Sequence, residues 1–142
     1  MKYLPAFFIG FLLAALLFYA FQSAPDYTLL LDYLATVPNL NANSKEWLLL
    51  LFHDSLISII SAAAIVFGYR KLMPVQPFDW LAIALMQLPV TVLITMVNGV
   101  PARFSTTYEV ATSVASIFAL SCVLLVYAAI IAYNKALKAD SQ

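Results

Sequence analysis

The sequence has few charged residues, and their distribution excludes several classes of protein. Only 10% of the 142 residues are charged, and the formal net charge is zero. A soluble domain carries about 25% charged residues, so this composition is not that of a soluble fold. The seven basic residues occur in ones and twos, which leaves no basic patch for nucleic acid. We therefore expect no nucleic-acid partner.

Motifs for redox chemistry, phosphate binding and metal binding are also missing. The single cysteine, Cys122, permits no intramolecular disulfide and no cysteine-pair redox chemistry. The three glycines stand alone and form no phosphate-binding loop. The single histidine, His53, has no second histidine, cysteine pair or His-Glu-x-x-His motif to complete a metal site. We expect no cofactor and no metal, and a non-enzymatic role ahead of an enzymatic one.

Hydrophobic side chains make up 64% of the sequence. Four apolar runs of about 19–25 residues lie near 4–22, 47–69, 78–98 and 109–133, and a helix needs roughly 20 residues to cross a hydrocarbon core of about 30 Å. Lipid requires internally bonded backbones, and the alternation typical of a membrane barrel is absent. The sequence predicts an all-α integral membrane protein, a single domain over 1–142 with four transmembrane helices in an antiparallel bundle.

The distribution of basic residues predicts the orientation of the four spans. Five basic residues precede the first run, separate the second from the third, or follow the fourth: Lys2, Arg70, Lys71, Lys135 and Lys138. Lys45 and Arg103 lie on the other side. The positive-inside rule then places both termini in the cytoplasm, and we expect a bacterial inner membrane. A cleaved signal peptide is the alternative for the first run, but its length and the residues around Gln22 favour an uncleaved anchor.

The first outer loop has the pattern of a short helix. Ser23 is a suitable cap, Pro25 suits the first turn, and leucines recur at helical spacing up to Pro38. We predict an amphipathic helix at about 24–37, which either lies along the outer membrane face or packs over the bundle.

Polar residues inside the runs are the candidate functional residues. Asp54 lies within the second run, where an acid costs about 2.5–3.5 kcal/mol on insertion scales, so it should face the bundle interior or a watery cavity. Helical spacing and depth bring further polar residues from three runs towards it. The predicted outward-opening polar pocket consists of Asp54, Ser58, Gln87, Thr91, Thr95 and Ser116. His53 and Asp54 together are a candidate proton site.

A packing role is the alternative for these residues. Serine and threonine are common at helix contacts in membranes, where an interhelical hydrogen bond contributes only about 0.6–2 kcal/mol. Gln87 is a candidate to satisfy the carbonyl of Leu85, which loses its donor because of Pro89. His53 is about 100° from Asp54 around the helix, so it cannot fully share the face of Asp54 and could meet another span. Two small-residue ridges predict close helix contacts: Gly10 with Ala14, and Ala111, Ala115, Ala119 and Cys122.

Three functions remain open on the sequence. The first is a non-enzymatic accessory or assembly subunit, with the lipid bilayer and other membrane subunits, or further copies of itself, as partners. The second is a small oligomeric transporter or channel that uses the pocket around Asp54. The third is a lipid-acting membrane enzyme with Asp54, Glu109 or Arg103 as candidate groups.

Overall fold

The computed structural model describes residues 1–22, 36, 42–98 and 107–139, and every regular element within these ranges is a helix. The helices are α1 (Leu4–Gln22), α3 (Ala42–Leu72), α4 (Trp80–Asn98) and α5 (Thr107–Ala139). All four are long and apolar enough to cross a membrane, which confirms the four predicted helical runs. The helix predicted at about 24–37 lies outside the described residues.

Two helices extend further than the apolar runs predict. α3 begins at Ala42 and ends at Leu72, and α5 continues to Ala139. An apolar run measures only the part of a helix that suits lipid, whereas lysine, glutamate and alanine continue a helix readily beyond it. Pro74, two residues after the end of α3, cannot continue that helix. At 31 and 33 residues, α3 and α5 are about 47 and 50 Å long at 1.5 Å per residue.

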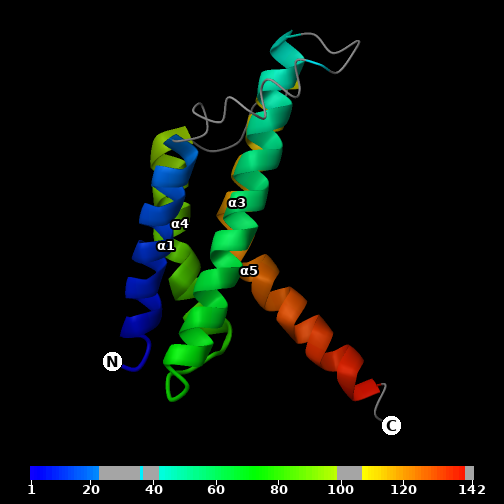
Figure 1. Cartoon of the computed structure of the whole chain (residues 1–142). Helices are drawn as coiled ribbons and strands as arrows, with labels where there is room; N and C mark the ends of the chain where they lie inside the picture. The colour runs from blue at the N-terminus through cyan, green and yellow to red at the C-terminus, as the bar shows by residue number, and fades with distance from the viewer. Residues whose placement is uncertain (23–35, 37–41, 99–106, 140–142) are drawn as a thin grey trace.

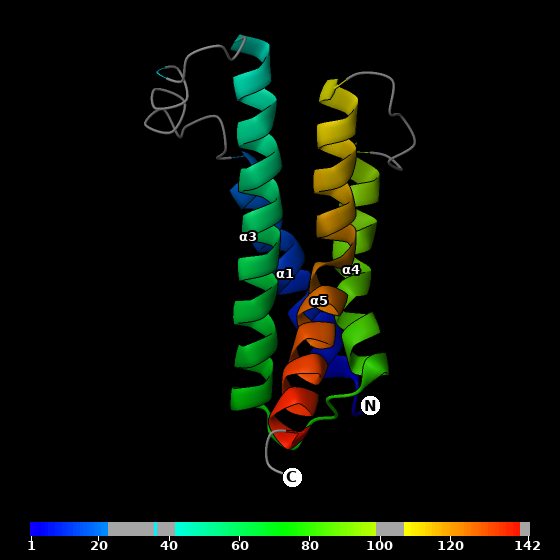
Figure 2. The ribbon, with the colours of Figure 1, turned by 90° about the vertical axis from the view of Figure 1, so that its right-hand side faces the viewer.

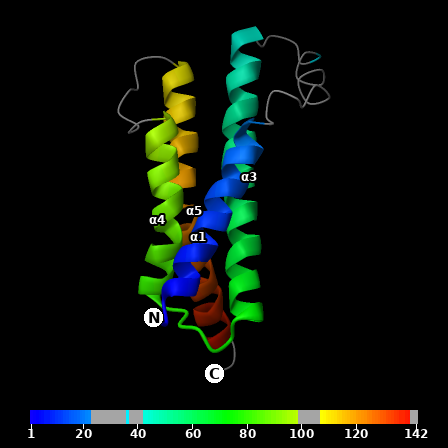
Figure 3. The ribbon, with the colours of Figure 1, turned by 90° about the vertical axis from the view of Figure 1, so that its left-hand side faces the viewer.

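Successive helices run in opposite directions (Figures 1 to 3). α1 packs against α4 and α3, and α5 packs against α3 and α4. The N-terminus, the turn between α3 and α4 and the end of α5 lie at the same end of the molecule (Figure 1). That end carries Lys2, Arg70 and Lys71, together with the two lysines of α5.

The core is apolar and includes one very close approach of two helices. Its largest fully buried side chains include Leu13 and Leu17 of α1, Tyr69 of α3 and Met86 of α4. Gly10 of α1 lies against the backbone of Met86, and a Cβ atom built on Gly10 would be 2.4 Å from the Met86 carbonyl oxygen. A side chain of any size at position 10 therefore requires α1 to move away from α4.

Hydrogen bonds fix the start of α4 at the basic end. The Asp79 Oδ1 atom accepts from the backbone N–H of Ala82 at 3.0 Å, as an N-cap does. Tyr3 donates its hydroxyl to Asp79 Oδ2 at 2.9 Å, which ties the start of α1 to the same carboxylate. The Ala82 N–H is the largest of the influences that hold the pKa of Asp79 below its usual range. The bond to Asp79 raises the pKa of Tyr3.

α5 bends along its length. Its first half follows α3, and its second half, drawn orange to red, turns away from α3 (Figure 1). Ala115, Ala119 and Cys122 of the predicted small-residue ridge are buried, which confirms packing at these three positions; the side chain of Ala111 lies outside what the structure describes. From Ile131 onward every residue of α5 is exposed.

Candidate functional site: the His53–Asp54 pair and the Gln87 clamp

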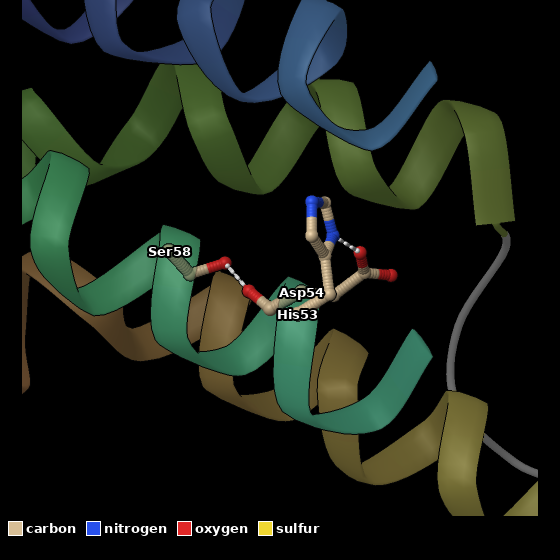
Figure 4. Close-up of polar contacts among 3 residues, drawn as sticks. All are labelled: His53, Asp54 and Ser58. Carbon is tan, nitrogen blue, oxygen red and sulfur yellow. Dashed lines mark hydrogen bonds and ion pairs between the residues drawn. The ribbon is translucent and has the colours of Figure 1, made fainter. Parts of the chain in front are cut away.

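His53 and Asp54 form a hydrogen-bonded pair on α3, inside the apolar segment Leu51–Leu72. The His53 Nδ1 and Asp54 Oδ1 atoms are 2.9 Å apart. Their side chains are 9% and 23% exposed, respectively. Figure 4 shows both side chains pointing to the side of α3 that faces α4 and α1, away from α5. The pair thus lies on the side of α3 away from α5 and is partly shielded from the surroundings.

The side chains of His53 and Asp54 meet although they start from different sides of α3. Successive residues of a helix are about 100° apart. In the structure, the side chains turn toward each other and meet directly. An ionised carboxylate can only accept a hydrogen bond, so with Asp54 ionised the Nδ1 atom of His53 carries the proton. The structure thus brings the two side chains into contact, and the proton site that they would form remains a prediction.

The Ser58 hydroxyl near Asp54 bonds to the backbone of α3 and not to the Asp54 carboxylate. Ser58 is fully buried and donates to the backbone carbonyl of Asp54 at 2.6 Å. A serine that bonds to the carbonyl four residues earlier is satisfied within its own helix. The Ser55 hydroxyl, which sequence reasoning did not select, is buried and has no hydrogen-bond partner among the described residues. No pattern in the sequence distinguishes Ser55 from a packing serine.

Gln87 joins α4 to α5 through the backbone of α5. Its Nε2 atom donates to the carbonyl of Ala119 at 3.2 Å, and its Oε1 atom accepts from the N–H of Val123 at 2.9 Å. The Cys122 thiol approaches the same Oε1 atom at 3.9 Å. Ala119 and Val123 are four residues apart, so their carbonyl and N–H are the pair that an undisturbed helix would bond to each other. The Gln87 amide bridges both members of that pair.

We call this bridge the Gln87 clamp. α5 bends part-way along its length (Figure 1), and a side chain inserted at a backbone hydrogen bond is one recognised cause of such a bend. The clamp also gives both ends of a buried amide a partner, as burial in an apolar core requires. The Gln87 amide therefore bonds to Ala119 and Val123 of α5 and not to the Leu85 carbonyl, its candidate partner from the sequence.

The remaining residues of the predicted pocket are distributed along α4 and α5. Thr91 donates its hydroxyl to the carbonyl of Gln87 at 3.2 Å, and Thr95 donates to the carbonyl of Thr91 at 2.6 Å. Both threonines are therefore bonded to their own helix. Ser116 is 7% exposed on α5. The carboxylate of Asp54 bonds to His53, and the pocket that would join it to these residues remains a prediction.

The structure describes only some of the residues that could bind a metal or act on lipid. Within the described ranges, no three His, Cys, Asp or Glu side chains are grouped closely enough to hold a metal ion. Arg103 and the side chain of Glu109 lie outside what the structure describes.

Comparison with known protein families, curated proteins and solved structures gives no match to this chain.

Proposed function

We propose that this chain is a four-span integral membrane protein of a bacterial inner membrane, with both termini in the cytoplasm, and that it acts as a non-enzymatic accessory or assembly subunit of a larger membrane complex. The spans would form an antiparallel bundle. Supporting the orientation, the two chain ends and the α3–α4 turn lie at one end of the molecule, with the basic residues that favour the cytoplasm.

The observation that carries the subunit proposal is how the intramembrane polar groups are used. Gln87 bonds to the backbone of α5, while Ser58, Thr91 and Thr95 bond to the backbones of their own helices. A permeation path needs polar groups that exchange partners with a passing solute. The Gln87 bonds hold α4 to α5, and the three hydroxyls are already satisfied within their own helices. This is the pattern of a structural membrane protein.

Detergent-free extraction of the chain at its native abundance tests this proposal. We expect a particle clearly larger than the 15.7 kDa chain, with another membrane protein present at fixed stoichiometry by native mass spectrometry. Recovery of the chain alone, or as a homo-oligomer only, contradicts the subunit proposal.

The His53–Asp54 pair supports a second candidate, a small transporter or channel coupled to a proton or cation. Asp and His within a membrane are typical members of proton relays, and this pair is held in contact and is partly accessible. Purified chain in liposomes would then carry a proton or cation flux that Asp54→Asn abolishes at equal protein content. Ser61→Ala is the matched control, since it changes a polar residue on the same helix outside the pair. Absence of flux in the parent protein rejects the transporter candidate.

A further inference from the structure

The end of α5 forms a segment that the other described residues do not cover. Between residues 128 and 139 only Ile130 is buried. The exposed fractions of Tyr133 and Leu137 are 65% and 52%. Figure 1 shows this segment leaving the other helices after the bend in α5. We call residues 128–139 the distal segment.

Two ring contacts place the start of the distal segment at the basic end of the molecule. Tyr127, the residue just before it, packs its ring against that of Phe78 with the centroids 5.4 Å apart. Phe78 directly precedes Asp79, which caps α4. The Arg70 guanidinium lies over the Phe78 ring at 5.4 Å. In the proposed orientation, Tyr127 is therefore near the cytoplasmic side of the bilayer, and the distal segment follows it.

The length of α5 agrees with this placement. Its 33 residues extend about 50 Å, whereas the hydrocarbon core is about 30 Å thick. The part of α5 that is apolar enough for lipid, Ser113–Ala139, has 27 residues, or about 40 Å, and exceeds the core by about 10 Å or roughly seven residues. The last seven residues of the distal segment, 133–139, match that excess and include Tyr133, Leu137 and both lysines.

The distal segment has a basic side and an apolar side. At about 100° per residue, Asn134, Lys135 and Lys138 share one side of the helix. Tyr133 and Leu137 lie about 150° from the two lysines, measured between the centres of the two pairs. These two residues continue the row of Val126 and Ile130, which are buried in the core at 7% and 9% exposure. Ile131, on the basic side, is the one large apolar residue that departs from this division.

We propose that the distal segment binds the anionic headgroup layer of the cytoplasmic leaflet. Lys135 and Lys138 contact lipid phosphates, and Tyr133 and Leu137 turn toward the acyl chains. A helix with one apolar and one basic side at the level of the headgroups has the features of an interfacial helix, and basic residues next to a span are attracted to anionic lipid. The Gln87 clamp supplies the bend that lets α5 leave the bundle at this level. The inference rests on the proposed orientation of the four spans.

Spin labels on the full chain test this proposal. Single cysteines replace Asn134 or Leu137 in a Cys122→Ala background, and the protein is placed in nanodiscs of phosphatidylglycerol with phosphatidylethanolamine or of phosphatidylcholine alone. Collisions with oxygen report acyl chains, and collisions with a water-soluble nickel chelate report water. In the anionic discs we expect oxygen to dominate at position 137 and nickel at position 134.

The double change Lys135→Gln with Lys138→Gln should lower the oxygen-to-nickel ratio at position 137 at least twofold in the anionic discs and leave it unchanged in phosphatidylcholine. Lys2→Gln with Lys71→Gln is the matched control, because it removes two charges from the same end of the molecule outside the distal segment, and it should have no effect. An equal ratio in the parent and the Lys135/Lys138 variant overturns the role of these lysines.

Two further outcomes overturn the proposal as a whole. Nickel dominance at position 137 means that the distal segment projects into water, and low access of both reagents means that a second copy or another protein covers it. The orientation is read separately, from labelling of a cysteine at Lys71 by an impermeant reagent in sealed vesicles. Labelling of that site from outside rejects the proposed orientation and leaves the reading of lipid contact at position 137 intact.

Discussion

Replacing Gly10 by alanine should weaken the contact between α1 and α4. The new Cβ atom would lie 2.4 Å from the carbonyl oxygen of Met86 and 3.0 Å from the Met86 carbonyl carbon and Cα. All three are backbone atoms, so no side-chain rotation relieves the clash. Ordinary van der Waals contact begins at 3.4 Å, and restoring it at the oxygen requires a shift of 3.4 − 2.4 = 1.0 Å between the two helices.

The size of the effect follows from two opposing terms. Overpacking of this kind costs about 1–3 kcal/mol, whereas alanine is favoured over glycine inside a helix by about 0.5–1 kcal/mol. Gly68 of α3 provides the matched control, because a Cβ atom there meets nothing within 4 Å. Gly68→Ala therefore gains the stability that alanine gives a helix, without introducing a clash. The two variants should therefore differ in stability by about 1–3 kcal/mol, with Gly10→Ala the less stable.

Reversible unfolding in mixed micelles, followed by circular dichroism as the fraction of denaturing detergent rises, measures this difference directly. The parent protein, Gly10→Ala and Gly68→Ala are compared under identical conditions. We expect Gly68→Ala to unfold at or above the parent midpoint and Gly10→Ala below that of Gly68→Ala. Equal stability of the two alanine variants would refute the close approach of α1 to the α4 backbone.

Three further predictions concern α5 and the α4 cap. Gln87→Leu removes the clamp and frees the Ala119 carbonyl to bond the Val123 N–H, so α5 should straighten. The distance between spin labels at positions 71 and 138 should then shorten, and an unchanged distance would show that the clamp does not cause the bend. Ala119→Leu places extra volume at a position only 1% exposed and should destabilise the protein by about 1–3 kcal/mol, whereas unchanged thermal stability in detergent would mean that this ridge is not tightly packed. Because the pKa of Asp79 is lowered in the folded protein, the ionised Asp79 carboxylate stabilises the fold fully above the usual carboxyl pKa, and this stabilisation is lost as pH falls through the lowered value. The melting temperature of the parent should therefore fall in acid more than that of Asp79→Asn, and parallel pH profiles of the two proteins would contradict a stabilising role for the ionised carboxylate.

The sequence predicts the helices well because each apolar run alone satisfies the length needed to cross a bilayer. The ends of α3 and α5 are missed, since residues such as Lys45 and Lys135 favour helix as well as water. The sequence also predicts Gly10 and Ala119 as contact positions, because small side chains mark close helix approach. It does not predict which residues they contact, since no local pattern specifies which helix lies opposite.

The candidate site is less predictable, because it depends on rotamers and on the register between helices. The spacing of Gln87, Thr91 and Thr95 identifies one polar side of α4, but it gives no sign that Gln87 reaches across to Ala119 and Val123. Helical geometry separates His53 from Asp54, and only the side-chain torsions bring the two together. The sequence could therefore indicate which residues are polar within the spans but not what each one bonds.

Both the proposed function and the proposed lipid contact of the distal segment depend on the orientation of the spans. That orientation is tested by finding the side of the membrane on which each end of α5 lies. Single cysteines at Lys71, Arg103 and Lys138 in a Cys122→Ala background are treated with a membrane-impermeant maleimide in right-side-out and inside-out vesicles. Four spans with cytoplasmic termini predict that Lys71 and Lys138 label only in inside-out vesicles and that Arg103 labels only in right-side-out vesicles. Labelling of Arg103 and Lys138 from the same side would show that α5 does not cross the membrane and would contradict the four-span arrangement.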